Sequence, residues 1–406
     1  MRPLWGRLPF PFPQLHELWE RRRFGRVASA SDELTVRVAY GHLHAILGHR
    51  FSRERLRRMA RQSQRMLRDT RFEISNPVLW GGFAFEGMEH LEAAVARGRG
   101  ALIVSFHVGP YRFIPIELAH LGHRVDVVVD QRGVERETAV IETQADLVSR
   151  AIIDAQGRIA HWRADLLGRI DVINAEEPDV AMRMVRALRD RRLVMVYLDG
   201  NTGAGPRKTE HLARVPFMGT HVLVRQGIGK IAKVTGAPVI VALSWRRLVR
   251  RHVCRFSAPI EPAPGEPREE FSNRALGEAM ALLAERLERD PGQWEEWHHL
   301  HRMHEEPAAL PDRSHPEPSP ELLAAPCAVD SYRAFAVSDG TAHFVFEPER
   351  RRFVRVSKLG FDLLRTMYEP RSVAELVALF GSSHGAQAVV EEVKRLATRG
   401  WLERSA

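Results

Sequence analysis

Three polar residues follow short apolar segments of this sequence, at positions where strands are expected to end. His107 comes directly after such a segment, and Asp130 and Asp199 close two others. In a parallel sheet the carboxyl ends of neighbouring strands meet at one edge, where functional side chains gather. A histidine there can take a proton from an attacking hydroxyl or amine. We therefore take His107 as a candidate catalytic base, helped by Asp199 or Asp130; a purely structural histidine is the alternative.

Patterns for cofactors and metals are missing from the sequence. Gly200, Gly203 and Gly205 do not have the spacing of a phosphate-binding or dinucleotide-binding loop. Cys254 and Cys327 are not spaced as a zinc site or a disulfide framework. The sequence thus predicts no bound cofactor and no metal, and so few cysteines are typical of a reducing compartment.

Strands and helices alternate from about residue 84 onward, and this part of the chain must position His107, Asp130 and Asp199. Strands are expected at 101–106, 125–131, 169–173, 193–199 and 238–245, and helices at 87–97, 135–156, 178–190, 222–235 and 272–289. This order predicts an α/β fold with a mixed, largely parallel sheet flanked by helices.

The composition is that of a globular protein with two or three domains. The chain has 406 residues, 44% of them hydrophobic and 27% charged, which excludes disordered, collagen-like and disulfide-scaffold classes. No apolar run approaches the roughly 18–20 residues of a membrane-spanning helix, so we expect a cytoplasmic protein.

The net charge is +9, and residues 14–74 are expected to be helical with an arginine-rich face. That face is either solvated or makes peripheral contact with anionic lipid at the inner face of the membrane.

Proline marks a boundary towards the C-terminal end. Six prolines lie between residues 307 and 326, which is linker composition. We therefore expect a first domain at 1–302, a linker at 303–330 and a second domain at 331–406. The second domain is expected to contain a strand hairpin and three helices, as in a winged helix-turn-helix.

Several segments of the first domain occur in the order found in a known enzyme family. The stretch FEGMEHLEAAVARGRGALIVSFHVGPYR resembles the core motif of the lipid A biosynthesis lauroyl acyltransferases, within the lysophospholipid acyltransferase superfamily. LVMVYLDGNTG, VPFMG, KIAKVTGAPVIVAL and PGQWEEWHHLHR resemble later family motifs, so the likeness covers about residues 30–302. In that family a histidine, with an acidic residue five positions later, activates an acceptor hydroxyl for attack on an acyl thioester. The resemblance implies that acyl-CoA or an acyl carrier protein is the donor.

His107 matches the family's histidine, but Arg112 stands where the acidic residue belongs. Three interpretations follow: an enzyme that uses histidine alone, one whose acid comes from Asp199 or Asp130, or an inactive fold that still binds an acyl or lipid group. An amine acceptor would need less help from a base than a hydroxyl. The expected substrate-binding residues under this resemblance are Arg112, Arg132, Gly109 and Gly219.

The C-terminal segment resembles a different family. VRVSKLGFDLLRTMYEPRSVAEL and the closing RGWLE are similar to the PqqD-like peptide-binding fold, which recognises precursors of ribosomally made peptide natural products. Such modules hold a leader peptide as an extra strand on the edge of a hairpin, beside the last helix. The peptide-binding residues implied here are Ala342, His343, Phe344, Val345, Phe346, Val389, Val393 and Leu396.

The C-terminal segment has two other interpretations, and the second of them is disfavoured. A generic winged-helix interaction domain has the same order of elements. Nucleic acid is not an expected partner, because Glu391 and Glu392 lie in the last helix where a base-reading face needs positive charge.

The combination of the two segments suggests a function that neither suggests alone. A peptide-binding module tethered to an acyltransferase-like domain raises the concentration of the bound peptide near the active site. The sequence therefore predicts transfer of a fatty acyl group from an acyl thioester to a ribosomally made precursor peptide. The alternatives are an inactive scaffold that binds peptide and lipid, and a glycolipid or phospholipid acyltransferase.

Overall fold

The computed structural model describes residues 30–75, 83–131, 133–135, 137–139, 168–200, 212–248, 251–303, 324–329, 334–338, 343–347 and 352–404. Most of the expected linker lies outside these residues, as do Arg132 and Ala342. The chain divides into two compact units. The first contains residues 1–27 and 61–296, and the second contains residues 28–60 and 297–406.

The first unit is built on a seven-stranded sheet with the order β1-β9-β8-β2-β5-β3-β4. Its strands are β1 (Phe83–Glu86), β2 (Ala101–Ser105), β3 (Val125–Val129), β4 (Ile170–Asn174), β5 (Leu193–Tyr197), β8 (Val239–Leu248) and β9 (Arg251–Phe256). Neighbouring strands are parallel except for β8 and β9, which form an antiparallel pair. The predicted mixed, largely parallel sheet is therefore confirmed.

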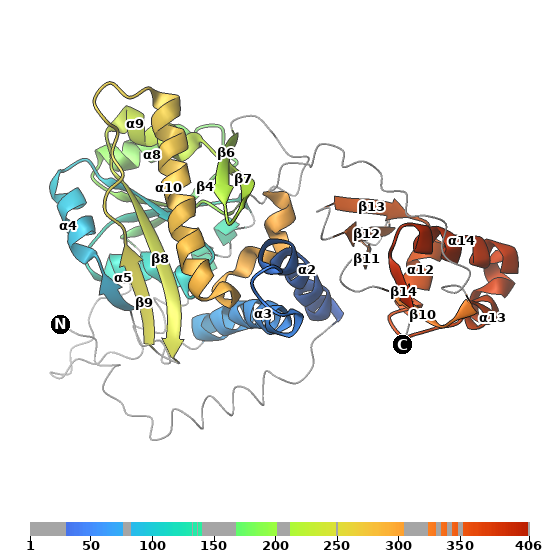
Figure 1. Cartoon of the computed structure of the whole chain (residues 1–406). Helices are drawn as coiled ribbons and strands as arrows, with labels where there is room; N and C mark the ends of the chain where they lie inside the picture. Colours follow the sequence, from blue (N-terminus) through green and yellow to red (C-terminus); the bar gives the residue numbers. More distant parts are fainter. Residues whose placement is uncertain are drawn as a thin grey trace, which may run out of the picture. The chain divides into compact units, whose positions relative to one another are not determined.

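Helices flank both faces of this sheet because its strands are apolar on both sides, as buried parallel strands are. Every second residue of the central strands, such as Ile103 and Met195, packs with α4 (Met88–Ala96) and α5 (Ile114–His120). The alternate residues, such as Val104, are also buried. On that other face lie α8 (Val180–Arg189), α9 (Gly227–Thr235) and α10 (Arg268–Arg289) (Figure 1).

Further elements belong wholly or partly to the first unit. The antiparallel hairpin of β6 (Leu212–Phe217) and β7 (Thr220–Arg225) packs on α10. Two 3-10 segments, η3 (Tyr111–Phe113) and η4 (Pro291–Gln293), lie near the carboxyl end of β2. Helix α3 (Arg53–Ser75) contributes residues to both units.

The second unit contains a three-stranded antiparallel sheet of β11 (Phe335–Ser338), β12 (His343–Glu347) and β13 (Arg352–Val356), with β12 in the middle. Helices α12 (Lys358–Thr366), α13 (Val373–His384) and α14 (Ala386–Thr398) follow, and β10 (Cys327–Val329) pairs with β14 (Leu402–Arg404). Two further elements of this unit are α2 (Ala30–Leu47) and most of η5 (Glu295–Arg302). The first two residues of η5 belong to the first unit.

The placement of α2 differs from the domain boundaries expected from the sequence. We predicted a first domain at 1–302, but α2 groups with the C-terminal residues because it packs on their sheet. The ring of His42 meets Phe346 edge-on with 5.1 Å between centroids, and His42 Nδ1 lies 2.6 Å from the Trp297 carbonyl oxygen. Phe346 is therefore covered from the side of the sheet opposite the three C-terminal helices.

Candidate active site

The parallel register of β2 and β5 brings His107 and Asp199 together. Ser105 is paired with Tyr197, and the Leu198 amide donates to the Ser105 carbonyl oxygen at 2.9 Å. His107 and Asp199 each lie two residues beyond that pair, at the carboxyl ends of adjacent strands. Neighbouring strands run about 4.8 Å apart, so the two side chains meet without any special loop conformation.

The Asp199 carboxylate is buried and accepts three hydrogen bonds. His107 Nδ1 lies 2.8 Å from Oδ1, the His107 amide donates to Oδ2 at 2.9 Å, and Trp294 Nε1 donates to Oδ2 at 2.7 Å. The Asp199 side chain is 0% exposed, whereas that of His107 is 18% exposed. A carboxylate only accepts hydrogen bonds, so His107 Nδ1 carries a proton and Nε2 of the neutral ring is left to act as a base.

The electrostatics of the pocket favour the charged form of His107. Burial on its own lowers the pKa of His107, but the Asp199 carboxylate, Glu296 and Glu295 together outweigh burial. The pKa of His107 is raised as a result to about 9. A ring with this pKa is protonated at neutral pH and gains its proton-accepting form as the pH rises.

A short antiparallel segment fixes Trp294 against the histidine loop. The Glu295 amide donates to the His107 carbonyl oxygen at 2.9 Å, and the Gly109 amide donates to the Gln293 carbonyl oxygen at 2.9 Å. Val108 forms a bridge with Trp294 between these two bonds. Backbone pairing of this kind holds the indole in one place, so Trp294 Nε1 helps to orient the Asp199 carboxylate.

Two tyrosines and two charged residues surround the pair. The ring centroids of Tyr111 and Tyr197 lie 4.7 and 5.1 Å from that of His107. Tyr111 also donates to the buried Glu295 carboxylate at 3.3 Å, and Arg112 forms a buried ion pair with Glu137. Burial raises the pKa of Glu295, while Arg112 opposes that shift.

Several residues predicted from the sequence have other roles in the structure. Asp130 is not the partner of His107: its carboxylate accepts the Gly133 amide at 2.7 Å. Arg112 was expected to contact substrate, but its guanidinium is paired with Glu137 and only 12% of the side chain is exposed. Arg132 lies outside the described residues.

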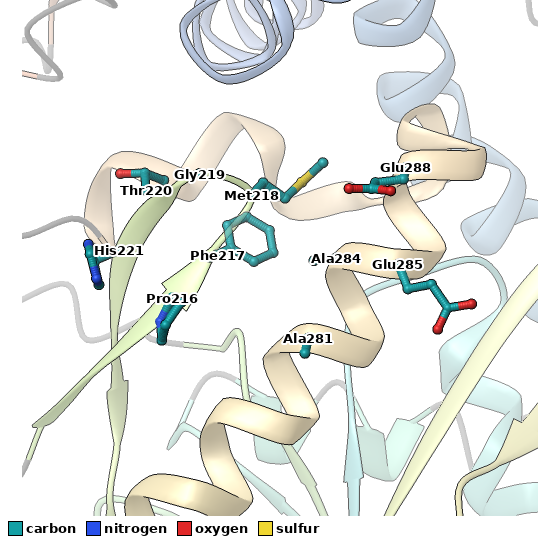
Figure 2. Close-up of a pocket in the computed structure, with 10 residues that line it drawn as sticks. All are labelled: Pro216, Phe217, Met218, Gly219, Thr220, His221, Ala281, Ala284, Glu285 and Glu288. Atoms are coloured by element: carbon teal, nitrogen blue, oxygen red, sulfur yellow. The ribbon is translucent and has the colours of Figure 1, made fainter.

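The two glycines expected to bind substrate are explained by backbone geometry. Gly109 has a φ of +59°, and a Cβ there would lie 2.7 Å from Trp245 Cα, so only glycine fits against β8. Gly219, with a φ of +79°, forms the turn between β6 and β7 together with Met218. It lines an open groove of about 560 Å³ between that hairpin and α10 (Figure 2). The groove is not at His107, but its wall residue Phe217 packs on Trp294 with 5.5 Å between ring centroids.

The expected peptide-binding edge lies on the middle strand of the three-stranded sheet. His343, Phe344, Val345 and Phe346 belong to β12, which is paired on both sides and has no free edge. The helix residues expected beside the peptide, Val389, Val393 and Leu396, are at most 1% exposed and pack in the core of the second unit. The sequence predicts strands separated by two turns here, but it does not show which strand lies in the middle of the sheet, and Ala342 lies outside the described residues.

Sequence reasoning missed four residues around the dyad, namely Trp294, Glu295, Tyr111 and Tyr197. Tyr197 closely precedes Asp199 at the end of the same predicted strand, and Tyr111 lies in the same loop as His107. For Trp294 and Glu295 the signal is the QWEEW segment, in which two consecutive acidic residues stand between two tryptophans. Acidic side chains are almost never fully buried unless they are paired, so carboxylates in such an aromatic segment indicate a polar site.

Comparison with known proteins adds no assignment: the chain matches no family model and no curated protein. Within the described residues, no group of three or more His, Cys, Asp or Glu side chains is arranged to hold a metal ion. No helix among the described residues is both long and apolar enough to cross a membrane.

Proposed function

We propose that this protein is an acyltransferase related to the lipid A biosynthesis lauroyl acyltransferases. It transfers a fatty acyl group from acyl-CoA or an acyl carrier protein to a ribosomally made precursor peptide. The observation that carries the proposal is the His107–Asp199 pair, with Nδ1 and Oδ1 at 2.8 Å, at the carboxyl edge of a parallel sheet. A buried carboxylate that orients a partly exposed imidazole is the arrangement a general base requires.

In the proposed reaction His107 moves one proton twice. Nε2 takes the proton of the acceptor hydroxyl or amine as the acceptor oxygen or nitrogen bonds to the thioester carbonyl carbon. The carbon–sulfur bond then breaks, and the departing thiolate takes the proton back from Nε2. Asp199 stays ionised throughout and stabilises the imidazolium formed in between.

This proposal answers the question raised by Arg112. The acid that the family places five residues after its histidine comes here from the neighbouring strand. Asp199 reaches His107 Nδ1 with a 2.8 Å contact, and Trp294 Nε1 donates to the same carboxylate. The change at position 112 is therefore compatible with activity, and the interpretation of a histidine without an acid is unnecessary.

The second unit is proposed to recruit the precursor peptide in the manner of a PqqD-like, winged helix-turn-helix-like module. An added strand needs an edge, and the described sheet has its edges at β11 and β13. The β11 edge is already used, because the Ala336 amide donates to Tyr368 Oη at 3.1 Å. β13 leads directly to Ser357, whose hydroxyl donates to Glu392 of α14 at 3.0 Å, so this edge ends beside the last helix. We therefore assign the peptide to β13.

The transfer reaction is tested by intact mass measurement. A candidate precursor peptide is co-expressed with the wild-type chain, with His107→Ala, and with Asp130→Asn as a control that removes a carboxylate from the same sheet edge. We expect a fatty-acyl mass increase with the wild type and the control, and none with His107→Ala. Peptide that binds but gains no mass with the wild-type chain would instead support an inactive scaffold.

The recruitment edge is tested by amide hydrogen exchange with and without the peptide. We expect slower exchange over residues 352–356, because their outward N–H groups become paired, and unchanged exchange over 335–338. Protection confined to 335–338, or none in the second unit, would contradict the assignment.

A further inference from the structure

The proposed reaction needs a hydrogen-bond donor, and the backbone amides next to His107 do not offer one. Attack on a thioester places negative charge on the carbonyl oxygen, and enzymes aim preorganised donors at that oxygen. Backbone N–H groups beside the base often serve, but here they are occupied. The His107 amide donates to Asp199, the Val108 amide to the Phe106 carbonyl oxygen and the Gly109 amide to Gln293. The next residue is Pro110, which has no N–H.

The Tyr197 hydroxyl is a donor whose partner is missing. Its oxygen is buried, and it makes no hydrogen bond within the part of the chain that the structure describes. Buried polar groups are nearly always paired, and an unpaired one costs free energy unless a ligand completes it. The other tyrosine at the site differs in this respect, because the Tyr111 hydroxyl is already bonded to Glu295.

The surroundings of Tyr197 suit a donor to an anion. Its ring lies 5.1 Å from that of His107 and 5.2 Å from that of Tyr111, which it meets edge-on. Burial raises the pKa of Tyr197 well above its usual value, whereas the Arg112 guanidinium acts to lower it. The phenol therefore keeps its proton across the working pH range, and the positive charge that acts on it favours a developing anion nearby.

We propose that Tyr197 is a further catalytic residue, whose hydroxyl donates a hydrogen bond to the thioester carbonyl oxygen as that oxygen becomes negative. No proton is transferred in this step: the hydroxyl bonds to the oxygen while the acceptor attacks and releases it when the carbon–sulfur bond breaks. This assignment rests on the proposed acyl transfer. It also gives Arg112 a role: its positive charge acts on the Tyr197 hydroxyl, and Arg112 need not contact the substrate.

The kinetic test compares Tyr197→Phe with the wild type and with the control Asp130→Asn, which changes a residue at the same sheet edge whose carboxylate accepts the Gly133 amide. Tyr197→Phe removes one hydroxyl from a ring packed on His107 and leaves the ring in place. We expect Tyr197→Phe to lower kcat for transfer from dodecanoyl-CoA to the peptide by about 10²-fold, with KM for the donor and the thermal midpoint nearly unchanged. Equal kcat for Tyr197→Phe and the wild type, with turnover intact, would overturn the inference and leave the proposed function standing.

A second measurement does not depend on turnover. Infrared difference spectra of ¹³C-carbonyl dodecanoyl-CoA are recorded on His107→Ala, which cannot turn over, and on His107→Ala combined with Tyr197→Phe. We expect the carbonyl stretch to be lowered on the first and to return towards its solution frequency on the second. The same frequency on both proteins, or no bound thioester at all, would refute the role of Tyr197. A lowered stretch without acyl transfer by the wild type would refute only the proposed function.

Discussion

Replacing Asp199 by Asn should move the acid limb of the pH–rate profile to lower pH. In the wild type the Asp199 carboxylate, aided by Glu296 and Glu295, outweighs burial and raises the pKa of His107 from 6.5 to about 9. That difference corresponds to about 3 kcal/mol in favour of the imidazolium. Only the neutral ring can accept a proton, so at pH 7 roughly 1% of the protein is in the active form. We therefore expect kcat/KM of the wild type to rise almost tenfold per pH unit and to level off near pH 9.

The variant loses the carboxylate that most strongly favours the charged ring but keeps the burial that opposes it. The pKa of the histidine in Asp199→Asn should therefore fall, and its acid limb should have a midpoint well below pH 9. The plateau should also drop by about 10²- to 10⁴-fold, because an amide no longer selects the tautomer with the proton on Nδ1. The two effects have opposite signs at low pH, so a full profile is needed rather than a single rate.

Thiol release from dodecanoyl-CoA, measured from pH 5.5 to 10 with the precursor peptide as acceptor, gives both profiles. Asp130→Asn is the control, because it removes a carboxylate from the same sheet edge without touching His107. Ionisation of the acceptor is common to all three proteins and cannot produce a shift between them. A wild-type profile that is flat between pH 6.5 and 9, or the same midpoint in Asp199→Asn, would refute this account of the dyad.

Three further predictions concern the residues around the dyad and the second unit. Trp294→Phe removes the Nε1 donor to Asp199 and should lower kcat about tenfold with little change in KM; an unchanged kcat would mean that His107 alone orients the carboxylate. Arg112→Glu, which restores the acid of the family motif, should destabilise the fold by about 3–5 kcal/mol in chemical denaturation, because it sets a second buried carboxylate against Glu137. A gain in activity would show that the motif position still serves as the acid. Ser372→Ala breaks the capping box of α13 and should cost about 1 kcal/mol of stability, while peptide affinity measured by calorimetry stays the same.

The sheet could be predicted from the sequence because its strands are short continuous apolar runs. Strands such as 101–105 and 193–197 are buried on both faces, so their composition alone identifies them. The candidate base and its possible acids could also be predicted, because each of them stands at the end of such an apolar run. The choice between Asp199 and Asp130 depends on strand order. β5 lies next to β2, whereas β3 lies one strand further away, and no local pattern contains that information.

Contacts between distant segments explain the remaining differences. Nothing in residues 30–47 indicates that His42 will pack on Phe346, about 300 positions away, so the grouping of this helix with the C-terminal residues could not be predicted. The same limit applies to the C-terminal sheet. The strands and turns of this segment can be recognised from the sequence, but which strand lies in the middle of the sheet depends on pairing, and β12 is paired on both sides.

The charges around His107 give a physical reason why an arginine can stand at the acidic position of the motif. Once Asp199 occupies the ring nitrogen, a second carboxylate in the loop would add negative charge to a pocket that already holds Glu295 and Glu137. Buried like charges raise each other's pKa and destabilise the fold. Arg112 reverses that effect, because its charge pairs with Glu137 and opposes the rise in the pKa of Glu295. In the proposed acyltransferase, the acid on the neighbouring strand and the arginine at position 112 therefore depend on each other. The pair Arg112→Met with Glu137→Met should cost far less stability than either substitution alone.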